Sequence, residues 1–147
     1  MPSKKLLFAM VFAIVLFCLT WLFFTKMLPA WAVRDCIQGQ YDEIYRINDL
    51  IRRARDTGDE YLEPFRLRAC TKCIWFNSSE STLKIIFYQE KEPVSIPVES
   101  GWGASKDFDS REKALNVPGF TYRFRITRVG IEECFNCEDN TGKCEVS

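Results

Sequence analysis

Two pairs of cysteines have the spacing in this chain that most often supports chemistry. Cys70 and Cys73 are separated by two residues in "RACTKCIWF", and Cys134 and Cys137 repeat this spacing in "EECFNCEDN". Four thiolates can hold zinc in a tetrahedral site, and a single pair can act as a redox centre. Cysteines of an exported domain instead form structural disulfides. The three interpretations predict different functions.

The residues around the two pairs disfavour a zinc site and a redox centre. Roughly 60 residues separate the pairs, whereas a compact zinc ribbon has about 15–20. A redox cysteine commonly lies at a helix N-terminus, which lowers the pKa of its thiol. Here "CTKCIWF" continues into β-branched and aromatic residues, and "CFNCEDN" continues into an acidic turn. We keep a membrane-tethered thiol-redox or zinc-binding protein that uses both pairs as the alternative hypothesis.

The cysteine count favours structural disulfides. Cys18 lies in an apolar segment, and the six other cysteines lie outside it: Cys36, Cys70, Cys73, Cys134, Cys137 and Cys144. An even number of cysteines in an exported domain is typical of a disulfide framework. We expect Cys137 and Cys144 to close a tight turn, and Cys36 to bond with Cys70, Cys73 or Cys134. No metal and no cofactor is expected.

An uncharged apolar segment precedes these six cysteines. Residues 6–24 carry no charge, and a helix of this length reaches ~28 Å, close to the thickness of a bilayer's hydrocarbon layer. Lys4 and Lys5 before it favour a cytoplasmic N-terminus. We therefore expect a signal-anchor and a single-pass membrane protein whose C-terminal domain is extracytoplasmic. The alternative is a long signal peptide cleaved after Ala32, at "PAWA", which would release a secreted protein.

The pattern after Pro29 predicts an amphipathic helix followed by strands. Apolar residues recur every three or four positions, at Ile37, Tyr41, Ile44, Ile47, Ile51 and Ala54, and Gly58 follows as a stop signal. Strand patterns occupy residues 65–70, 83–88, 94–98 and 121–129, and residues 130–135 are a further candidate. We expect an α+β fold in which the amphipathic helix packs on one small antiparallel β-sheet and disulfides stabilise the whole.

These patterns divide the chain into four segments. We expect a cytoplasmic tail at residues 1–5, a transmembrane helix at 6–28, the amphipathic helix at 29–58 and an extracytoplasmic β-rich domain at 59–147. The chain has 20 acidic and 20 basic residues, so no overall field draws it to nucleic acid. It has no histidine, the commonest general base. We therefore expect no enzyme, and no small-molecule substrate is inferred.

Three residues are candidates for an interaction surface, and one for a modification. Trp102 lies between two glycines, and Arg123 and Arg125 lie on the outward face of the predicted strand at 121–129. For Trp102 the alternative is that its loop folds back and plugs the end of the sheet. Asn77 begins "NSS", the acceptor pattern for N-glycosylation.

The expected function follows from these segments. We expect a non-catalytic, membrane-anchored protein that is a structural or interaction component of the cell envelope and binds a protein partner there. A membrane helix that continues into an amphipathic helix packed on an antiparallel sheet is similar in layout to type IV pilin-like proteins. A prepilin-type processing site is not found in "PSKKLLF", and Pro29 is expected to interrupt the helix. Filament assembly is therefore a variant of this expectation.

Overall fold

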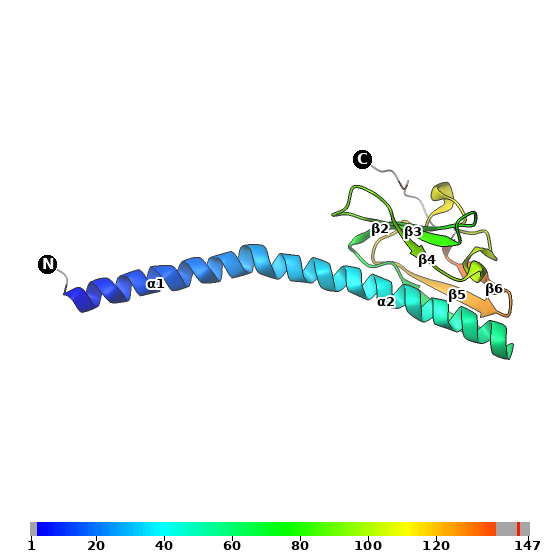
Figure 1. The fold of residues 1–147 in the computed structure, drawn as a ribbon, viewed down its shortest axis with the longest axis horizontal. Helices are drawn as coiled ribbons and strands as arrows, with labels where there is room; N and C mark the ends of the chain where they lie inside the picture. The colour runs from blue at the N-terminus through cyan, green and yellow to red at the C-terminus, as the bar shows by residue number, and fades with distance from the viewer. Residues whose placement is uncertain (1–2, 138–143, 145–147) are drawn as a thin grey trace. The chain divides into compact units, whose positions relative to one another are not determined.

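The computed structural model describes residues 3–137 and 144. The chain forms two compact units, Met1–Asp35 and Cys36–Ser147, and each is described by itself. The first unit contains helix α1 (Lys4–Leu22), the π-helical turn η1 (Phe23–Met27) and the beginning of helix α2 (Leu28–Thr57). Figure 1 labels the two α-helices.

Helix α1 is apolar on all sides. The hydroxyl of Ser3 caps its first turn by accepting a hydrogen bond from the N–H of Leu6, and none of its residues is buried within the protein. Side chains such as Phe8, Phe12 and Phe17 are exposed, which is costly in water and favourable in lipid. Among the described residues, one helix is long and apolar enough to cross a membrane, judged by length and composition, and it includes α1.

Pro29 does not interrupt the helix, and this expectation is wrong. It is the second residue of α2 and lies two residues after the end of the π-helical turn, where the N–H of Leu28 donates to the carbonyl of Phe23, five residues earlier. A proline lacks an N–H, and its ring collides with the carbonyl of the preceding turn. A wider turn before the proline relieves this collision. The helix therefore widens where the sequence predicted a break.

The part of α2 in the second unit is amphipathic, as predicted. Its buried residues are Gln40, Ile44, Ile47, Ile51 and Ala54. The helix ends at Thr57, and Gly58 follows with a φ of 78°, a left-handed conformation that glycine adopts readily. The expected apolar stripe and the expected stop are confirmed.

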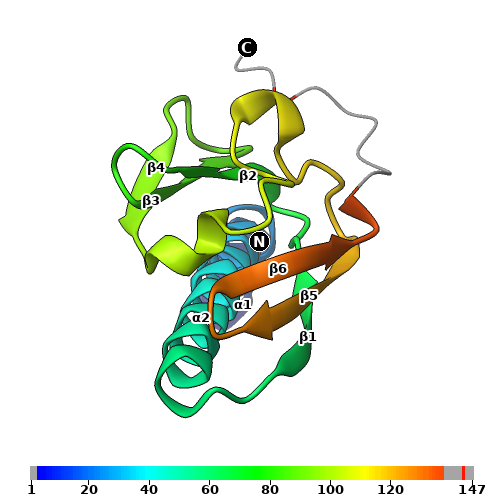
Figure 2. The same cartoon turned by 90° about the vertical axis from the view of Figure 1, so that its right-hand side faces the viewer.

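The strands form two small antiparallel sheets, where we expected one. Strands β1 (Tyr61–Arg66), β5 (Thr121–Thr127) and β6 (Gly130–Phe135) form a sheet in the order β1-β5-β6. Strands β2 (Thr71–Asn77), β3 (Thr82–Phe87) and β4 (Val94–Pro97) form the second, in the order β2-β3-β4. Figure 2 shows the two sheets and α2 around a shared interior. The α+β fold class is confirmed, and the single sheet is wrong.

The first strand lies nearer the N-terminus than its pattern predicted. We expected residues 65–70 to be extended, but β1 ends at Arg66. The N–H of Leu67 still bonds to the carbonyl of Phe120. The next N–H, that of Arg68, donates instead to the side chain of Gln40 on α2, at 2.8 Å. A buried side chain of the helix therefore ends the strand, and a periodicity argument does not reveal this.

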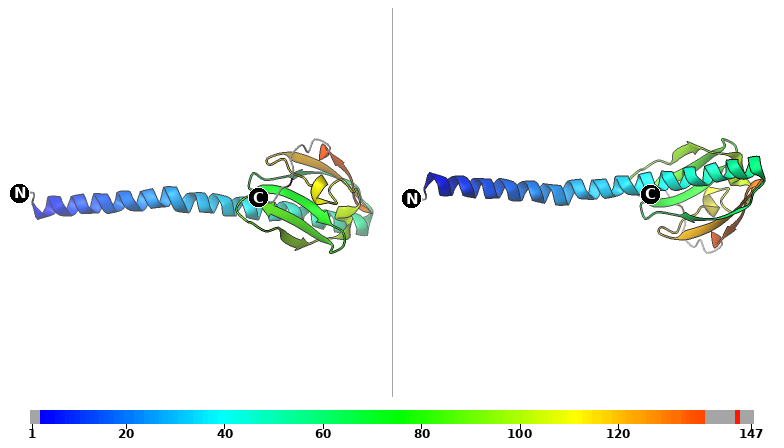
Figure 3. Two further views of the ribbon diagram at one scale, coloured as in Figure 1. Left: turned by 90° about the horizontal axis from the view of Figure 1, so that it is seen from above. Right: turned by 90° about the horizontal axis from the view of Figure 1, so that it is seen from below.

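One hydrophobic core joins α2 to both sheets. The right-hand view of Figure 3 shows the Cys36–Thr57 part of α2 between strands of the two sheets. Its isoleucines pack with side chains of β1, β2, β3, β5 and β6. The connection between β4 and β5 adds two short 3-10 turns, η2 (Ser100–Gly103) and η3 (Arg111–Lys113). This connection places Trp102 and Phe108 in the core.

Candidate functional site

The six cysteines outside α1 form three disulfides. They are Cys36–Cys70, Cys73–Cys144 and Cys134–Cys137. Cys18 is exposed and free. The predicted involvement of all six is thus confirmed, and Cys70 is one of the three partners expected for Cys36.

The expected Cys137–Cys144 disulfide is wrong. Cys137 bonds to Cys134, and Cys144 bonds to Cys73 on β2. The reason is local: β6 ends at Phe135, and Asn136 has a φ of 67°. This left-handed residue turns the chain, so that Cys137 comes back to Cys134. The rest of the predicted turn, residues 138–143, lies outside the described residues.

The two CxxC pairs are therefore not one cluster of thiolates. Cys70 and Cys73 belong to different disulfides, and only Cys134 and Cys137 bond within their own motif. In residues 3–137 and 144 no group of three or more His, Cys, Asp and Glu side chains has the geometry to hold a metal ion.

The Cys36–Cys70 disulfide belongs to a buried polar network at the beginning of the second unit. Cys70 donates its N–H to Cys36 Sγ at 3.3 Å. One turn further along α2, Gln40 is fully buried. Its Oε1 accepts bonds from the N–H of Arg68 and from Thr71 Oγ1, at 2.8 and 3.0 Å, and its Nε2 donates to the carbonyl of Arg66. Every polar atom of this side chain has a partner, which a buried amide requires.

Trp102 is not an exposed contact residue, and this prediction is wrong. Its side chain is fully buried against Phe65, Phe108 and Phe124. The indole N–H donates to Asn48 Oδ1 at 3.2 Å. The alternative interpretation, in which the loop folds back onto the β-structure, is the one that the geometry supports.

The glycines on either side of Trp102 have a packing role. A Cβ at Gly101 would lie 2.7 Å from the side chain of Ile51 and 2.9 Å from the Cα of Gly130. A Cβ at Gly103 would collide with the ring of Phe76. The backbone of η2 therefore approaches its neighbours closely, and this brings the indole into the core.

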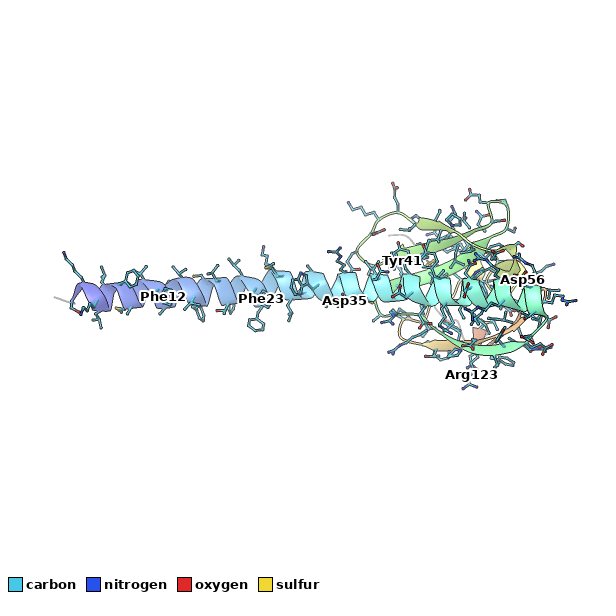
Figure 4. The ribbon with its side chains drawn as sticks, turned by 60° about the horizontal axis from the view of Figure 1, so that its bottom comes forward. Phe12, Phe23, Asp35, Tyr41, Asp56 and Arg123 are labelled. Carbon is cyan, nitrogen blue, oxygen red and sulfur yellow. A yellow bond between two sulfur atoms is a disulfide. The ribbon has the colours of Figure 1, made fainter. Side chains whose placement is uncertain are left out.

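The two candidate arginines differ in how they are paired. The Arg125 guanidinium lies 3.3 Å from Glu132, 3.5 Å from Glu133 and 3.9 Å from Glu60. The side chain of Arg123 is exposed, and Figure 4 shows it pointing away from the sheet. Among residues 3–137 and 144, no carboxylate lies within ion-pair distance of Arg123. Of the two, Arg123 is the cation available to a partner.

Both arginines belong to one solvent-facing surface, which we call the outer face. It is the exposed side of the β1-β5-β6 sheet and consists of Glu60, Leu62, Pro64, Arg66, Thr121, Arg123, Arg125, Glu132, Glu133 and Phe135. Leu62 and Phe135 are 56% and 43% exposed. Together with Arg125 they line part of a shallow groove of about 420 Å³. Exposed apolar side chains beside charged ones are typical of an interaction surface.

The apolar members of the outer face were absent from the predicted candidates. Strand alternation could have indicated Leu62, because it faces opposite to the buried Phe65 in the same strand. Phe135 gave no such signal, since a bulge at Arg125 and Ile126 changes the register of β6.

Asn77 is the last residue of β2 and begins the turn to β3. Its Oδ1 accepts hydrogen bonds from the N–H and the Oγ of Ser79, at 3.1 and 2.7 Å. These bonds stabilise the turn, which gives the "NSS" triplet a structural role. N-glycosylation of Asn77 stays a prediction.

The shifted pKa values have structural causes. Hydrogen bonds from Arg52 and then Arg55 hold the pKa of the Glu99 carboxyl below its ordinary value, and the closest contacts are 3.2 and 2.9 Å. Burial raises the pKa of the Tyr122 phenol. Glu99 joins α2 to the start of η2, and Tyr122 lies in the core. Both pKa shifts therefore follow from contacts that hold the fold together.

Comparisons of the chain with protein-family models, with curated proteins and with solved structures found no match. The chemistry of the chain's own residues therefore carries the functional argument.

Proposed function

We propose that the chain is a non-catalytic, single-pass membrane protein whose Cys36–Ser147 unit is extracytoplasmic and binds a protein partner in the cell envelope. The observation that carries this proposal is the combination of an apolar N-terminal helix with three disulfides in the unit that follows it. Disulfides persist in oxidising compartments and are rare in the cytosol. A helix that inserts in a membrane is the simplest route by which this unit reaches such a compartment.

The proposed orientation rests on the charges beside the helix. Lys4 and Lys5 precede the apolar residues, and positive charge is retained on the cytoplasmic side. The N-terminus is then cytoplasmic, and the cysteines lie on the opposite side. A signal peptide cleaved after Ala32 would deliver the same unit as a secreted protein. The similarity in layout to type IV pilin-like proteins keeps filament assembly as a variant.

A function based on surface contacts agrees with where the polar side chains lie and what they bond to. Gln40, Asn48 and Glu99 hold the fold together, whereas the outer face exposes apolar groups and the guanidinium of Arg123. A surface of this kind binds another macromolecule through an apolar centre with charged groups at its rim.

Accessibility and mass measurements test the proposal. The full chain carries a C-terminal tag in intact cells or spheroplasts, and a protease added outside is expected to remove the tag. Intact mass before and after alkylation under denaturing conditions is expected to show six oxidised cysteines and one alkylated cysteine, Cys18. A tag protected until the membrane is permeabilised, or seven alkylated cysteines, would contradict the proposal.

A second candidate is favoured by the Cys134–Cys137 disulfide, which bonds the two ends of one CxxC motif. A membrane-tethered thiol-redox protein would use this bond. In glutathione buffers of increasing reducing strength, it predicts a step in which two cysteines become alkylated and four remain oxidised. The zinc-binding variant predicts four alkylatable thiols besides Cys18, or a zinc ion that stays with the purified protein. Simultaneous reduction of all three disulfides would contradict both.

A further inference from the structure

Charge on the outer face is separated along the strands. The strand register places Leu62, Arg125 and Glu133 in one row across the sheet, and Pro64, Arg123 and Phe135 in the neighbouring row. Along β1, Glu60 precedes the first row and Arg66 comes after the second. The face therefore has one end near Glu60 and another near Arg66, and the charged side chains at these two ends differ.

The end that contains Glu60 is acidic. Glu60, Glu132 and Glu133 surround the single guanidinium of Arg125. Three carboxylates against one guanidinium leave an excess of two negative charges at this end of the face.

The opposite end is basic. It carries Arg66 and Arg123, which are both exposed. Within residues 3–137 and 144, no carboxylate lies at ion-pair distance from either guanidinium. Two positive charges at this end thus match the excess of two negative charges at the other.

Apolar side chains lie between the two ends. Leu62, Pro64 and Phe135 are exposed and occupy the two central rows. Counted over residues 3–137 and 144, the outer face thus has an apolar centre, an acidic end and a basic end of equal and opposite charge.

We propose that the outer face binds a second copy of this chain, in an antiparallel arrangement with two-fold symmetry. In such a pair the same surface is used twice, so that residue i contacts residue j and residue j contacts residue i. The acidic end of each copy then meets the basic end of the other, and the apolar centres meet at the axis. A pair in which the two outer faces run in the same direction would bring like charges together and is therefore disfavoured. This inference rests on the proposed function, because it names the partner of that surface.

The direction of α2 defines the geometry of the pair. Arg46 on α2 bonds to Glu63, and Gln40, earlier in the helix, bonds to Arg66, later in β1. Strand β1 therefore runs antiparallel to α2, and the acidic end of the outer face lies towards Thr57. In the pair, the Cys36 end of one second unit lies beside the Thr57 end of the other.

A charge exchange between two copies tests this arrangement. The full chain is prepared in excess detergent with either of two affinity tags, so that copies share no bilayer, and co-purification of the two tags is measured. In Arg123→Glu homodimers, the introduced carboxylate faces the end that carries Arg125 with Glu60, Glu132 and Glu133, whose net charge is negative, at both contacts. In Glu133→Lys homodimers, the introduced ammonium group faces basic residues at both contacts. We expect each variant alone to weaken self-association about tenfold.

A mixture of the two variants is expected to restore co-purification towards the wild-type level. In the mixed pair, the introduced carboxylate of one copy meets the introduced ammonium group of the other, and at the second contact the native residues meet. Glu133→Lys leaves Arg125 with Glu60 and Glu132, so the monomer keeps two of its ion pairs. The matched control is Lys91→Glu in the exposed loop between β3 and β4, which is expected to leave co-purification unchanged.

Three results would overturn the inference: wild-type copies that do not co-purify, single variants that co-purify like the wild type, or a mixture that recovers nothing. In each case the proposed function still stands or falls by tag accessibility and disulfide content. A different envelope protein captured through the outer face would leave that function intact and replace the second copy as the partner.

Discussion

Close approach between two backbone segments determines which residues the chain accepts near Trp102. Gly130, at the start of β6, has a φ of 117° and lies against Gly101 of η2. A Cβ at Gly130 would overlap the carbonyl oxygen, the Cα and the carbonyl carbon of Gly101. The contact holds the β4–β5 connection against the β1-β5-β6 sheet and keeps the indole buried.

Gly130→Ala is expected to lower the free energy of unfolding by about 3 kcal/mol or more, because backbone strain is added to a backbone collision. The matched control is Gly119→Ala, at a φ of 80° with open space around the added Cβ, where strain alone costs about 1–2 kcal/mol. Denaturant unfolding followed by Trp fluorescence measures both. Equal losses in the two variants would show that the contact with Gly101 has no energetic role.

Glu99 gives the second unit a pH-dependent contribution to stability. Arg52 and Arg55 hold the pKa of the folded-state carboxyl below its ordinary value of 4.5. A carboxylate with a lowered pKa stabilises the fold above the unfolded-state value, and this contribution is lost as the pH falls through the folded-state pKa. Replacing Glu99 removes the contribution, so wild type and variant differ most at neutral pH.

Glu99→Gln is expected to lower the denaturant midpoint at pH 7, and the difference from wild type is expected to shrink as the pH falls below 4.5. Glu112→Gln is the control, since Glu112 is exposed in η3 and its replacement is expected to change little at either pH. A difference that persists at pH 3 would mean that Glu99 acts through its shape and not through its charge.

At the scale of elements, the buried amide of Gln40 connects α2 to the segment between β1 and β2. Its Oε1 receives two hydrogen bonds and its Nε2 donates one. Replacement by an apolar residue leaves the N–H of Arg68, the carbonyl of Arg66 and the fully buried hydroxyl of Thr71 without this partner. Buried backbone groups without a partner are destabilising.

Gln40→Leu is expected to destabilise the second unit by about 2–4 kcal/mol, from about 1–3 kcal/mol for each unsatisfied buried group. Gln38→Leu, two residues earlier on an exposed part of the same helix, serves as the control and is expected to stay within about 0.5 kcal/mol of wild type. Thermal or denaturant unfolding in detergent measures both. A similar loss in the two variants would contradict the role of the buried amide.

The elements also mark how far a sequence-based prediction reaches. The stripe from Ile37 to Ala54 identified α2 and its buried face, because helical periodicity is local. The pairing of strands is not local: alternation predicts which face a residue occupies, but not which strand lies beside it. The division into two sheets was therefore missed. The approach of η2 to β6 was missed as well, and it places Trp102 in the core and out of the expected surface.

The candidate site was predictable to a similar extent. The six cysteines were identifiable from their number, whereas the Cys134–Cys137 pairing depended on the turn at Asn136. Arg123 and Arg125 were both indicated by alternation in β5. The difference in their ion pairing was not predictable, because Glu60, Glu132 and Glu133 come together around Arg125 only when β1 and β6 flank β5.

At the scale of the whole molecule, the three disulfides close loops of very different length. Cys36–Cys70 and Cys73–Cys144 have sequence separations of 34 and 71, and Cys134–Cys137 has a separation of 3. In the chain-entropy model a disulfide stabilises the fold by restricting the unfolded chain, and the effect increases with the size of the loop. The first two bonds are therefore structural, and the third contributes least to stability.

Replacing Cys36 and Cys70 together by Ser is expected to cost about 4 kcal/mol, and replacing Cys134 and Cys137 together about 2 kcal/mol. Denaturant unfolding without reductant compares the two double variants. A larger loss for the Cys134 and Cys137 variant would mean that the end of β6 has a packing role beyond loop closure.

The position of Cys36 at the first residue of the second unit has a mechanical consequence. When a partner pulls on this unit while the preceding helix is held, the force acts first at Cys36, and the disulfide bond transmits it directly to Cys70. The 34-residue separation between them would otherwise allow ~115 Å of extension. The disulfide removes that extension, so that unfolding of the segment between Cys36 and Cys70 does not lengthen the chain under load.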